Sequence, residues 1–95
     1  MIYSVSSELY SEVVRSLCEA IGSSNYFSGT VCVSASDVAC RLTASVIVYR
    51  RHESLPEGDV ELISDLVPVW WEFRTETDRG EVDNDFSFAE LRRLL

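Results

Sequence analysis

The chain has 95 residues, which is enough for one hydrophobic core and lies near the lower end of the usual domain sizes. Its hydrophobic fraction of 46% and charged fraction of 25% are those of an ordinary globular protein and exclude a disordered or low-complexity chain. We therefore expect a single domain over residues 1–95, alone or as a small oligomer.

The net charge of −8 is concentrated in the second half of the chain. Residues 1–52 carry four acidic and four basic side chains, so residues 53–95 carry 12 acidic side chains against four arginines. A field of this sign repels nucleic-acid phosphates and anionic lipid heads, and the basic pair Arg50 and Arg51 is too small to offset it. We expect neither nucleic acid nor a membrane as a partner.

Several chemistries are excluded by composition. The chain contains no lysine, which removes Schiff-base catalysis, pyridoxal phosphate attachment and the P-loop, and no serine lies in a Gly-x-Ser-x-Gly elbow. No motif for a cofactor is present, so none is expected. Cys18, Cys32 and Cys40 are an odd number of thiols on a chain whose first residues lack a signal peptide, which indicates a cytoplasmic protein with reduced cysteines.

Residues 7–21 have the spacing of an amphipathic helix, with apolar residues every four positions at Leu9, Val13, Leu17 and Ile21. Ser6 or Ser7 is suited to cap its start and Gly22 to end it. Ahead of this helix, Ile2, Tyr3 and Val5 are compatible with a short extra edge strand.

The pattern changes to period two in residues 27–34 and 38–51, which predicts a hairpin that turns at residues 34–37. Matching the apolar sides pairs Val33 with Val38, Val31 with Cys40 and Gly29 with Leu42. Cys32 then faces away from Cys40, so we expect no disulfide between them.

Residues 52–59 form a turn-rich connection in which Pro56 and Gly58 suit the i+1 and i+3 positions of a type I turn. Apolar residues then fall on even positions in 60–62 and on odd positions in 67–73, so a bulge or a helical turn between residues 63 and 65 must change the parity. Within 67–73 the predicted dry side holds Val67, Val69, Trp71 and Phe73. Pro68 places this third strand at a sheet edge.

The last residues have the signals of a short helix that runs to Leu95. Ser87 and Glu90 match a capping box, and Phe86 with Leu91 matches a hydrophobic staple. Residues 77–81 before it read as a loop. The predicted fold is therefore a two-layer α+β domain of order α-β-β-β-α, in which both helices pack on one face of a three-stranded antiparallel meander. Double-stranded RNA-binding domains have a similar order of elements but bind through basic clusters that this chain lacks.

Two groups of residues can be interpreted either as chemically active or as ordinary solvated side chains. His52 is the only histidine and is either a solvated residue or a titrating group near Glu53. Glu81, Asp83 and Asp85 alternate with a spacing that invites a metal-site interpretation, but they lack the EF-hand spacing and its glycine, which favours a solvated acidic approach to the last helix. No metal site is predicted.

The mixed face of the sheet is the candidate functional surface. The alternation places Ile47, Tyr49, Trp70, Glu72 and Arg74 away from the helices, and tyrosine, tryptophan and arginine are enriched at interface hot spots. The plainer interpretation is that these aromatic residues only stabilise the sheet.

Three functions follow from these features. The first is a non-enzymatic protein–protein interaction module that self-associates, for example as a homodimer, or docks a protein partner through the open sheet face. The second is an acidic mimic of nucleic acid that inhibits a DNA-binding protein, and the third is a small ligand-binding domain or enzyme that uses His52.

Overall fold

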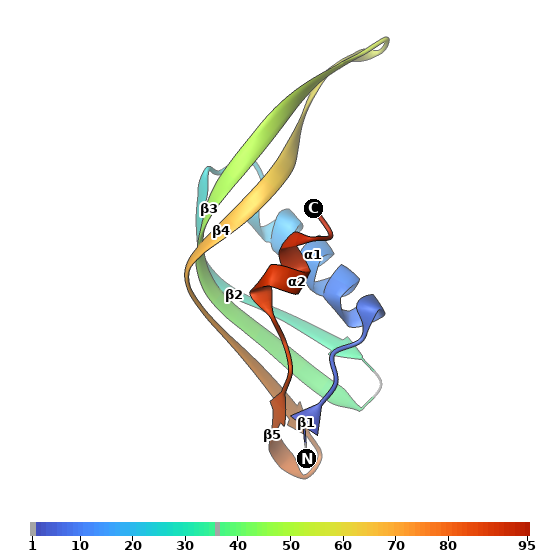
Figure 1. Cartoon of the computed structure of the whole chain (residues 1–95), viewed down its shortest axis with the longest axis vertical. Helices are drawn as coiled ribbons and strands as arrows, with labels where there is room; N and C mark the ends of the chain where they lie inside the picture. The colour runs from blue at the N-terminus through green and yellow to red at the C-terminus, as the bar shows by residue number, and fades with distance from the viewer. Residues whose placement is uncertain (1, 36) are drawn as a thin grey trace.

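The computed structural model describes residues 2–35 and 37–95, which form one sheet with two helices on one side of it (Figure 1). The strand order in the sheet is β1-β5-β4-β3-β2. In chain order the elements are β1 (Ile2–Tyr3), α1 (Ser7–Ile21), β2 (Tyr26–Ala35), β3 (Val38–Leu55), β4 (Gly58–Thr77), β5 (Gly80–Asn84) and α2 (Phe88–Arg92).

The predicted α+β class, with both helices against one face, is confirmed, whereas the predicted three-stranded antiparallel meander, present as β2, β3 and β4, is only part of the sheet. The sheet has five strands and is mixed, because β1 pairs in parallel with β5. The extra edge strand near Ile2 was anticipated from the sequence. Strand β5 was not, since residues 77–81 were predicted to be a loop and are instead the end of β4, a tight turn and the start of β5.

Helix α1 has the predicted bounds. Ser6 is the N-cap, and its Oγ accepts a hydrogen bond of 3.1 Å from the N–H of Leu9. Gly22 ends the helix with a φ of 57°, and its N–H donates to the carbonyl of Cys18. The four residues spaced by four are all buried, as Leu9, Val13, Leu17 and Ile21.

The hairpin of β2 and β3 keeps the predicted faces but not the predicted pairs. Val33 pairs with Cys40, Val31 with Leu42 and Gly29 with Ala44, so the register differs by two residues from the expectation. The loop is shorter than predicted because Ala35 already pairs with Val38; residue 36 of the predicted turn lies outside the described residues. A shift of two leaves every side chain on its face, which is why the alternation was right and the register was not.

Two irregularities in β4 change its parity twice. Tyr49 pairs with Asp65 and Arg50 with Ile63, which leaves Ser64 without a partner; this is the predicted change between residues 63 and 65 and is a bulge. Ser45 pairs with Trp70 and Val46 with Pro68, which leaves Val69 as a second extra residue. This second bulge was not predicted.

The bulge at Val69 corrects the predicted dry side of the third strand. Phe73 is buried as expected, but Val69 is 64% exposed and Val67 pairs with the exposed Ile47 on the other face. Leu66 takes the buried place instead, at 0% exposure opposite Val48. The prediction that this strand lies at a sheet edge holds only around Pro68: β4 is an inner strand where β5 pairs with Thr75 to Thr77, and no described strand adjoins Pro68 on that side.

Beyond Tyr49 the hairpin of β3 and β4 leaves the body of the protein as a two-stranded arm of residues 50–63 (Figure 1). The predicted connection of residues 52–59 is therefore mostly strand. Leu55 pairs with Gly58, so Pro56 and Gly58 occupy the predicted second and fourth positions of the turn. The arm explains why the molecule measures 50 × 25 × 19 Å.

An aromatic cluster joins the C-terminal segment to the sheet. The ring of Phe86 stacks on Phe73 at 4.0 Å between centroids and contacts Tyr10 at 5.3 Å and Trp71 at 5.4 Å. The Tyr10 hydroxyl accepts the N–H of Ser87.

Helix α2 departs from its prediction in two respects. Ser87 is its N-cap but makes no side-chain capping bond, so the predicted capping box does not form. The helix ends at Arg92 and not at Leu95, and Leu94 is 49% exposed. The packing of Phe88 and Leu91, both buried, fixes this short helix against the sheet.

Candidate interaction surface

The face of the sheet opposite the helices, here called the outer face, carries one side chain from every second residue of β2, β3 and β4. Register assigns these side chains to rows, because residues paired across an antiparallel sheet point to the same side. Tyr26, Ile47 and Val67 form one row across the three strands, and Tyr49 and Trp70 lie in the rows on either side of it.

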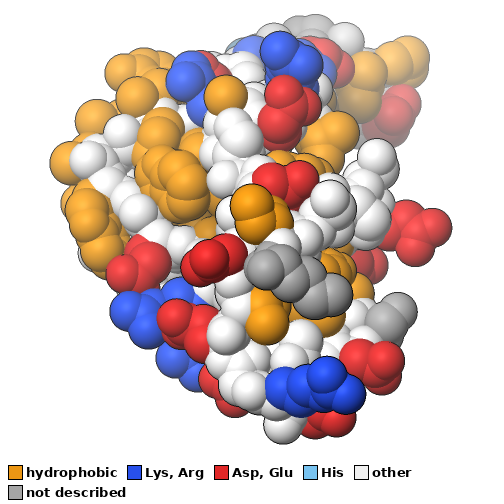
Figure 2. Space-filling model, turned by 60° about the horizontal axis from the view of Figure 1, so that its bottom comes forward, with side chains coloured by type: hydrophobic (Ala, Val, Ile, Leu, Met, Phe, Trp, Pro, Cys, Tyr) orange, Lys and Arg blue, Asp and Glu red, His pale blue; other side chains and the backbone are white. Residues whose placement is uncertain are grey.

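We call these five residues the apolar patch. Tyr26 is 52% exposed, Tyr49 51% and Trp70 53%, while Ile47 is 39% exposed. Figure 2 shows hydrophobic side chains gathered on one side of the molecule, with acidic and basic side chains below them. The predicted outward placement of Ile47, Tyr49 and Trp70 thus agrees with their register and exposure; Tyr26 and Val67 were missed.

A band of hydroxyl groups follows the apolar patch along the strands. Ser28 Oγ and Ser45 Oγ are 2.9 Å apart, and Thr30 Oγ1 and Thr43 Oγ1 are 3.0 Å apart. These cross-strand pairs satisfy each other, so the band ties β2 to β3 without an apolar contact.

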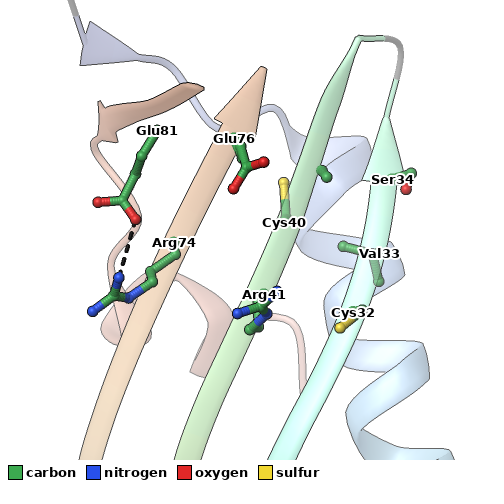
Figure 3. A pocket seen from close by; sticks show the side chains of 9 residues that line it. Cys32, Val33, Ser34, Cys40, Arg41, Arg74, Glu76 and Glu81 are labelled. Atoms are coloured by element: carbon green, nitrogen blue, oxygen red, sulfur yellow. Dashed lines mark hydrogen bonds and ion pairs between the residues drawn. The ribbon is translucent and has the colours of Figure 1, made fainter. Parts of the chain in front are cut away.

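The third region of the outer face, here called the charged end, surrounds a shallow concavity of about 230 Å³. The residues that line this concavity include Cys32, Arg41, Arg74, Glu76 and Glu81 (Figure 3). Arg41 of β3 pairs with Arg74 of β4, and Cys32 of β2 pairs with Arg41, so the three side chains form one row.

Arg74 holds two carboxylates at this end. Its Nε lies 2.5 Å from Oε1 of Glu72 and its Nη1 lies 3.1 Å from Oε1 of Glu81. The hydrogen bond from Arg74 lowers the pKa of Glu72, and both carboxylates raise the pKa of Arg74. Glu72 and Arg74, the two charged residues predicted for the interaction surface, form an ion pair at the border between the hydroxyl band and the charged end.

The remaining candidate residues lie apart from one another. His52 is on the arm, where its Nε2 lies 3.4 Å from Oδ2 of Asp59, and it does not line the concavity at the charged end. Glu81 and Asp83 belong to β5, whereas Asp85 follows that strand and accepts the N–H of Val5 at 2.7 Å. Within the described residues, no three histidine, cysteine, aspartate or glutamate side chains gather as a metal site.

The thiols occupy different environments. Cys40 is buried on the helix side and Cys32 is exposed on the outer face, so the sheet separates them, as the alternation predicted. Burial raises the pKa of Cys40, and it also raises the pKa of Cys18 on α1. Burial thus disfavours the thiolate form of both side chains.

Neither of the described helices has the length and apolar character needed to cross a membrane. Comparisons of the chain with protein-family models, with curated proteins and with solved structures found no match.

Proposed function

We propose that the protein is a non-enzymatic protein–protein interaction module that docks another protein through the apolar patch. The observation that carries the proposal is the row of Tyr26, Ile47 and Val67, which crosses three strands on a face where no described helix lies (Figure 1). On the helix side of the sheet an apolar row of this kind belongs to the core, whereas this row lies on the outer face and is exposed to solvent.

The residue types of the patch support a binding role. Tyrosine and tryptophan bring a large contact area at a small cost in side-chain entropy and dominate the energy of many interfaces. Tyr49 and Trp70 keep about half of their surface exposed while their stems are fixed in paired strands. A partner therefore meets two large aromatic side chains anchored in paired strands.

The charge of the outer face also favours docking. Three arginines, Arg41, Arg51 and Arg74, stand there among acidic side chains, and two of them, Arg51 and Arg74, make ion pairs with glutamates. A protein partner can approach it without overcoming a strong field of one sign.

The shape of the sheet favours a partner other than a second copy at this face. The sheet bends around the helices, so the outer face is its convex side (Figure 1). Two convex faces touch over a small area, whereas stable complexes bury about 800 Å² on each partner. A groove on a different protein covers the row more completely.

The two other functions have less support. Five of the acidic residues in 53–95 make ion pairs with arginine within the chain, namely Glu53, Asp65, Glu72, Glu81 and Glu90, which weakens the field that a nucleic-acid mimic needs. His52 stands on a two-stranded arm away from the described concavity at the charged end, which leaves a binding or catalytic role for it without a site.

Site-specific photo-cross-linking tests the proposal. A benzophenone amino acid replaces Tyr49 in one variant and Ser11, exposed on α1 across the molecule, in the control. In the cells that naturally produce the protein, we expect a discrete adduct with a second protein from position 49, none from position 11, and loss of the adduct when Trp70→Ser is added. The proposal is contradicted if both positions give equal adducts, if the adducts contain only two copies of this chain, or if the adduct survives Trp70→Ser.

A further inference from the structure

Strand β2 is the last strand of the sheet and has an open edge. It pairs with β3 over its ten residues, and no described strand lies on its other side. Every second residue of an edge strand directs its N–H and C=O away from its neighbour. Apart from the pairing with β3, no hydrogen bond among the described residues uses a backbone group of Tyr26–Ala35.

The other free edges of the sheet carry features that block pairing. Along β4 these are Pro68, which has no N–H, and the bulges at Ser64 and Val69, and along the arm part of β3 they are the charged residues Arg50, Arg51 and Glu53. The edge strand β1 is only two residues long. Such features are the usual protection of an edge against another strand.

Strand β2 lacks all of them. Its ten residues, Tyr-Phe-Ser-Gly-Thr-Val-Cys-Val-Ser-Ala, include no charge and no proline, and its pairing with β3 has no register shift. On the helix side, Phe27, Val33 and Ala35 pack against the core but stay half-buried. The edge is therefore long, regular, uncharged and bordered by incompletely covered apolar side chains.

We propose that β2 pairs antiparallel with β2 of a second copy, which joins the two five-stranded sheets into one continuous sheet. A second copy is the occupant that the sequence of β2 fits, because an uncharged strand pairs with itself without like-charge repulsion although each chain carries −8. Antiparallel pairing of one strand with its copy is also the arrangement that a two-fold dimer requires.

The two-fold symmetry limits the register. Paired residues share a face, so the two-fold axis passes a residue that pairs with its own copy, and Thr30 or Val31 gives the longest overlap of Tyr26–Ala35. With the axis at Thr30, Phe27 lies opposite Val33 of the second copy. With the axis at Val31, it lies opposite Ala35. Either register covers half-buried apolar side chains at the edge.

The dimer adds to the proposed docking function without depending on it. Because the joined sheet has one outer face, the two apolar patches lie on the same continuous surface. The pairing uses backbone groups at the edge and leaves Ile47, Tyr49 and Trp70 free for a partner.

Matched double substitutions test the pairing by sedimentation and light scattering. The test variant combines Ser28→Lys with Thr30→Lys and places two positive charges on the edge strand β2. The control variant combines Thr43→Lys with Ser45→Lys and places the same charges on β3, one strand away from the edge. Both variants remove the same two hydroxyl pairs. We expect a wild-type dimer at micromolar concentrations, a dimer for the β3 variant, and a dissociation constant about tenfold or more weaker for the β2 variant, because like charges then face each other across the edge.

The proposal is overturned if the wild type is monomeric or if the two double variants behave alike. A dimer that persists in the β2 variant but dissociates with Trp70→Ser also overturns it and assigns self-association to the outer face. Circular dichroism on each variant establishes that a loss of dimer is not a loss of fold.

Thiol cross-linking locates the axis. In a background with Cys18→Ala, Cys32→Ser and Cys40→Ala, Thr30→Cys should form a covalent dimer with a short bifunctional maleimide when the axis passes Thr30. A variant that carries Thr30→Cys and retains Cys32 should form this covalent dimer when the axis passes Val31, because residue 30 of one copy then lies opposite residue 32 of the other. Thr43→Cys, the cross-strand partner of Thr30, should stay monomeric under the same treatment, and cross-linking equal to that of Thr30→Cys would contradict the pairing.

Discussion

The two ends of the hairpin formed by β3 and β4 differ in what covers them. In the body, Leu42, Val46 and Leu66 are at most 1% exposed, because α1 and α2 stand over that face (Figure 1). In the arm of residues 50–63 the two strands pair without interruption from Arg50 to Leu55, yet Leu55 and Leu62 remain 39% and 38% exposed. Strand pairing alone thus does not make a core, which also requires a helix over the face of the sheet.

The largest expected contrast is between two leucines of β4. Leu66→Ala removes a side chain with 0% exposure and leaves a cavity, which should lower the free energy of unfolding by about 2–5 kcal/mol. Leu62→Ala, four residues away on the arm, should change it by less than about 0.5 kcal/mol. Urea denaturation of both variants measures the difference, and equal losses would show that the arm is packed as tightly as the body.

A smaller effect is expected where the arm joins the body. Arg50 Nη2 donates hydrogen bonds of 2.8 Å to the carbonyls of Gly22 and Ser24, just after α1, and so fixes the base of the arm to the end of that helix. Arg50→Met should lower the free energy of unfolding by about 1 kcal/mol. The control is Arg51→Met, whose side chain reaches Glu53 on the other face. If the control destabilises as much as Arg50→Met, the contacts to Gly22 and Ser24 do not stabilise the junction.

The smallest effect concerns pH and the ion pair that ties α2 to the same junction. Arg92 donates hydrogen bonds to both oxygens of Asp65, at 2.9 and 2.6 Å, and this lowers the pKa of Asp65. Because the pKa of Asp65 is lower in the folded protein than in the unfolded chain, the ion pair stabilises the protein at pH values above the ordinary carboxyl pKa. This contribution disappears as pH falls through the folded pKa.

Asp65→Asn should therefore be less stable than the wild type at neutral pH by a small margin, because both side chains are partly exposed. The margin should shrink toward zero in acid, as urea midpoints at several pH values would show. A stability difference between the wild type and Asp65→Asn that increases in acid would contradict a stabilising ion pair between Asp65 and Arg92.

Much of the body could be predicted because local signals agree there. The period of four and the caps at Ser6 and Gly22 define α1, and strict alternation defines the faces of β2 and β3. Register was not predictable from the same pattern, since pairing Val31 with Cys40 or with Leu42 buries the same row.

The rest depends on contacts between distant segments. Strand β5 is acidic and lacks strand-forming residues apart from Val82, and it forms because Thr75 Oγ1 donates to the carbonyl of Val82 and Asn84 reaches the carbonyl of Phe73. The bulge at Val69 lies beside Pro68, but a proline in a strand indicates either an edge or a bulge, so the change of parity did not follow from it. For the candidate surface, the exposed Tyr49 and Trp70 followed from alternation, but Val67 required the bulge and Tyr26 required the register.

The central claim is that one extra residue at Val69 turns Leu66 into the core and places Val67 in the apolar patch. Single cysteines at the two positions test it, in a background with Cys18→Ala, Cys32→Ser and Cys40→Ala, by their rates of reaction with a thiol reagent. The structure predicts that Val69→Cys reacts nearly as fast as in the unfolded chain and that Leu66→Cys is strongly protected. A protected residue 69 beside a reactive residue 66 would contradict the bulge and, with it, the row that forms the docking surface.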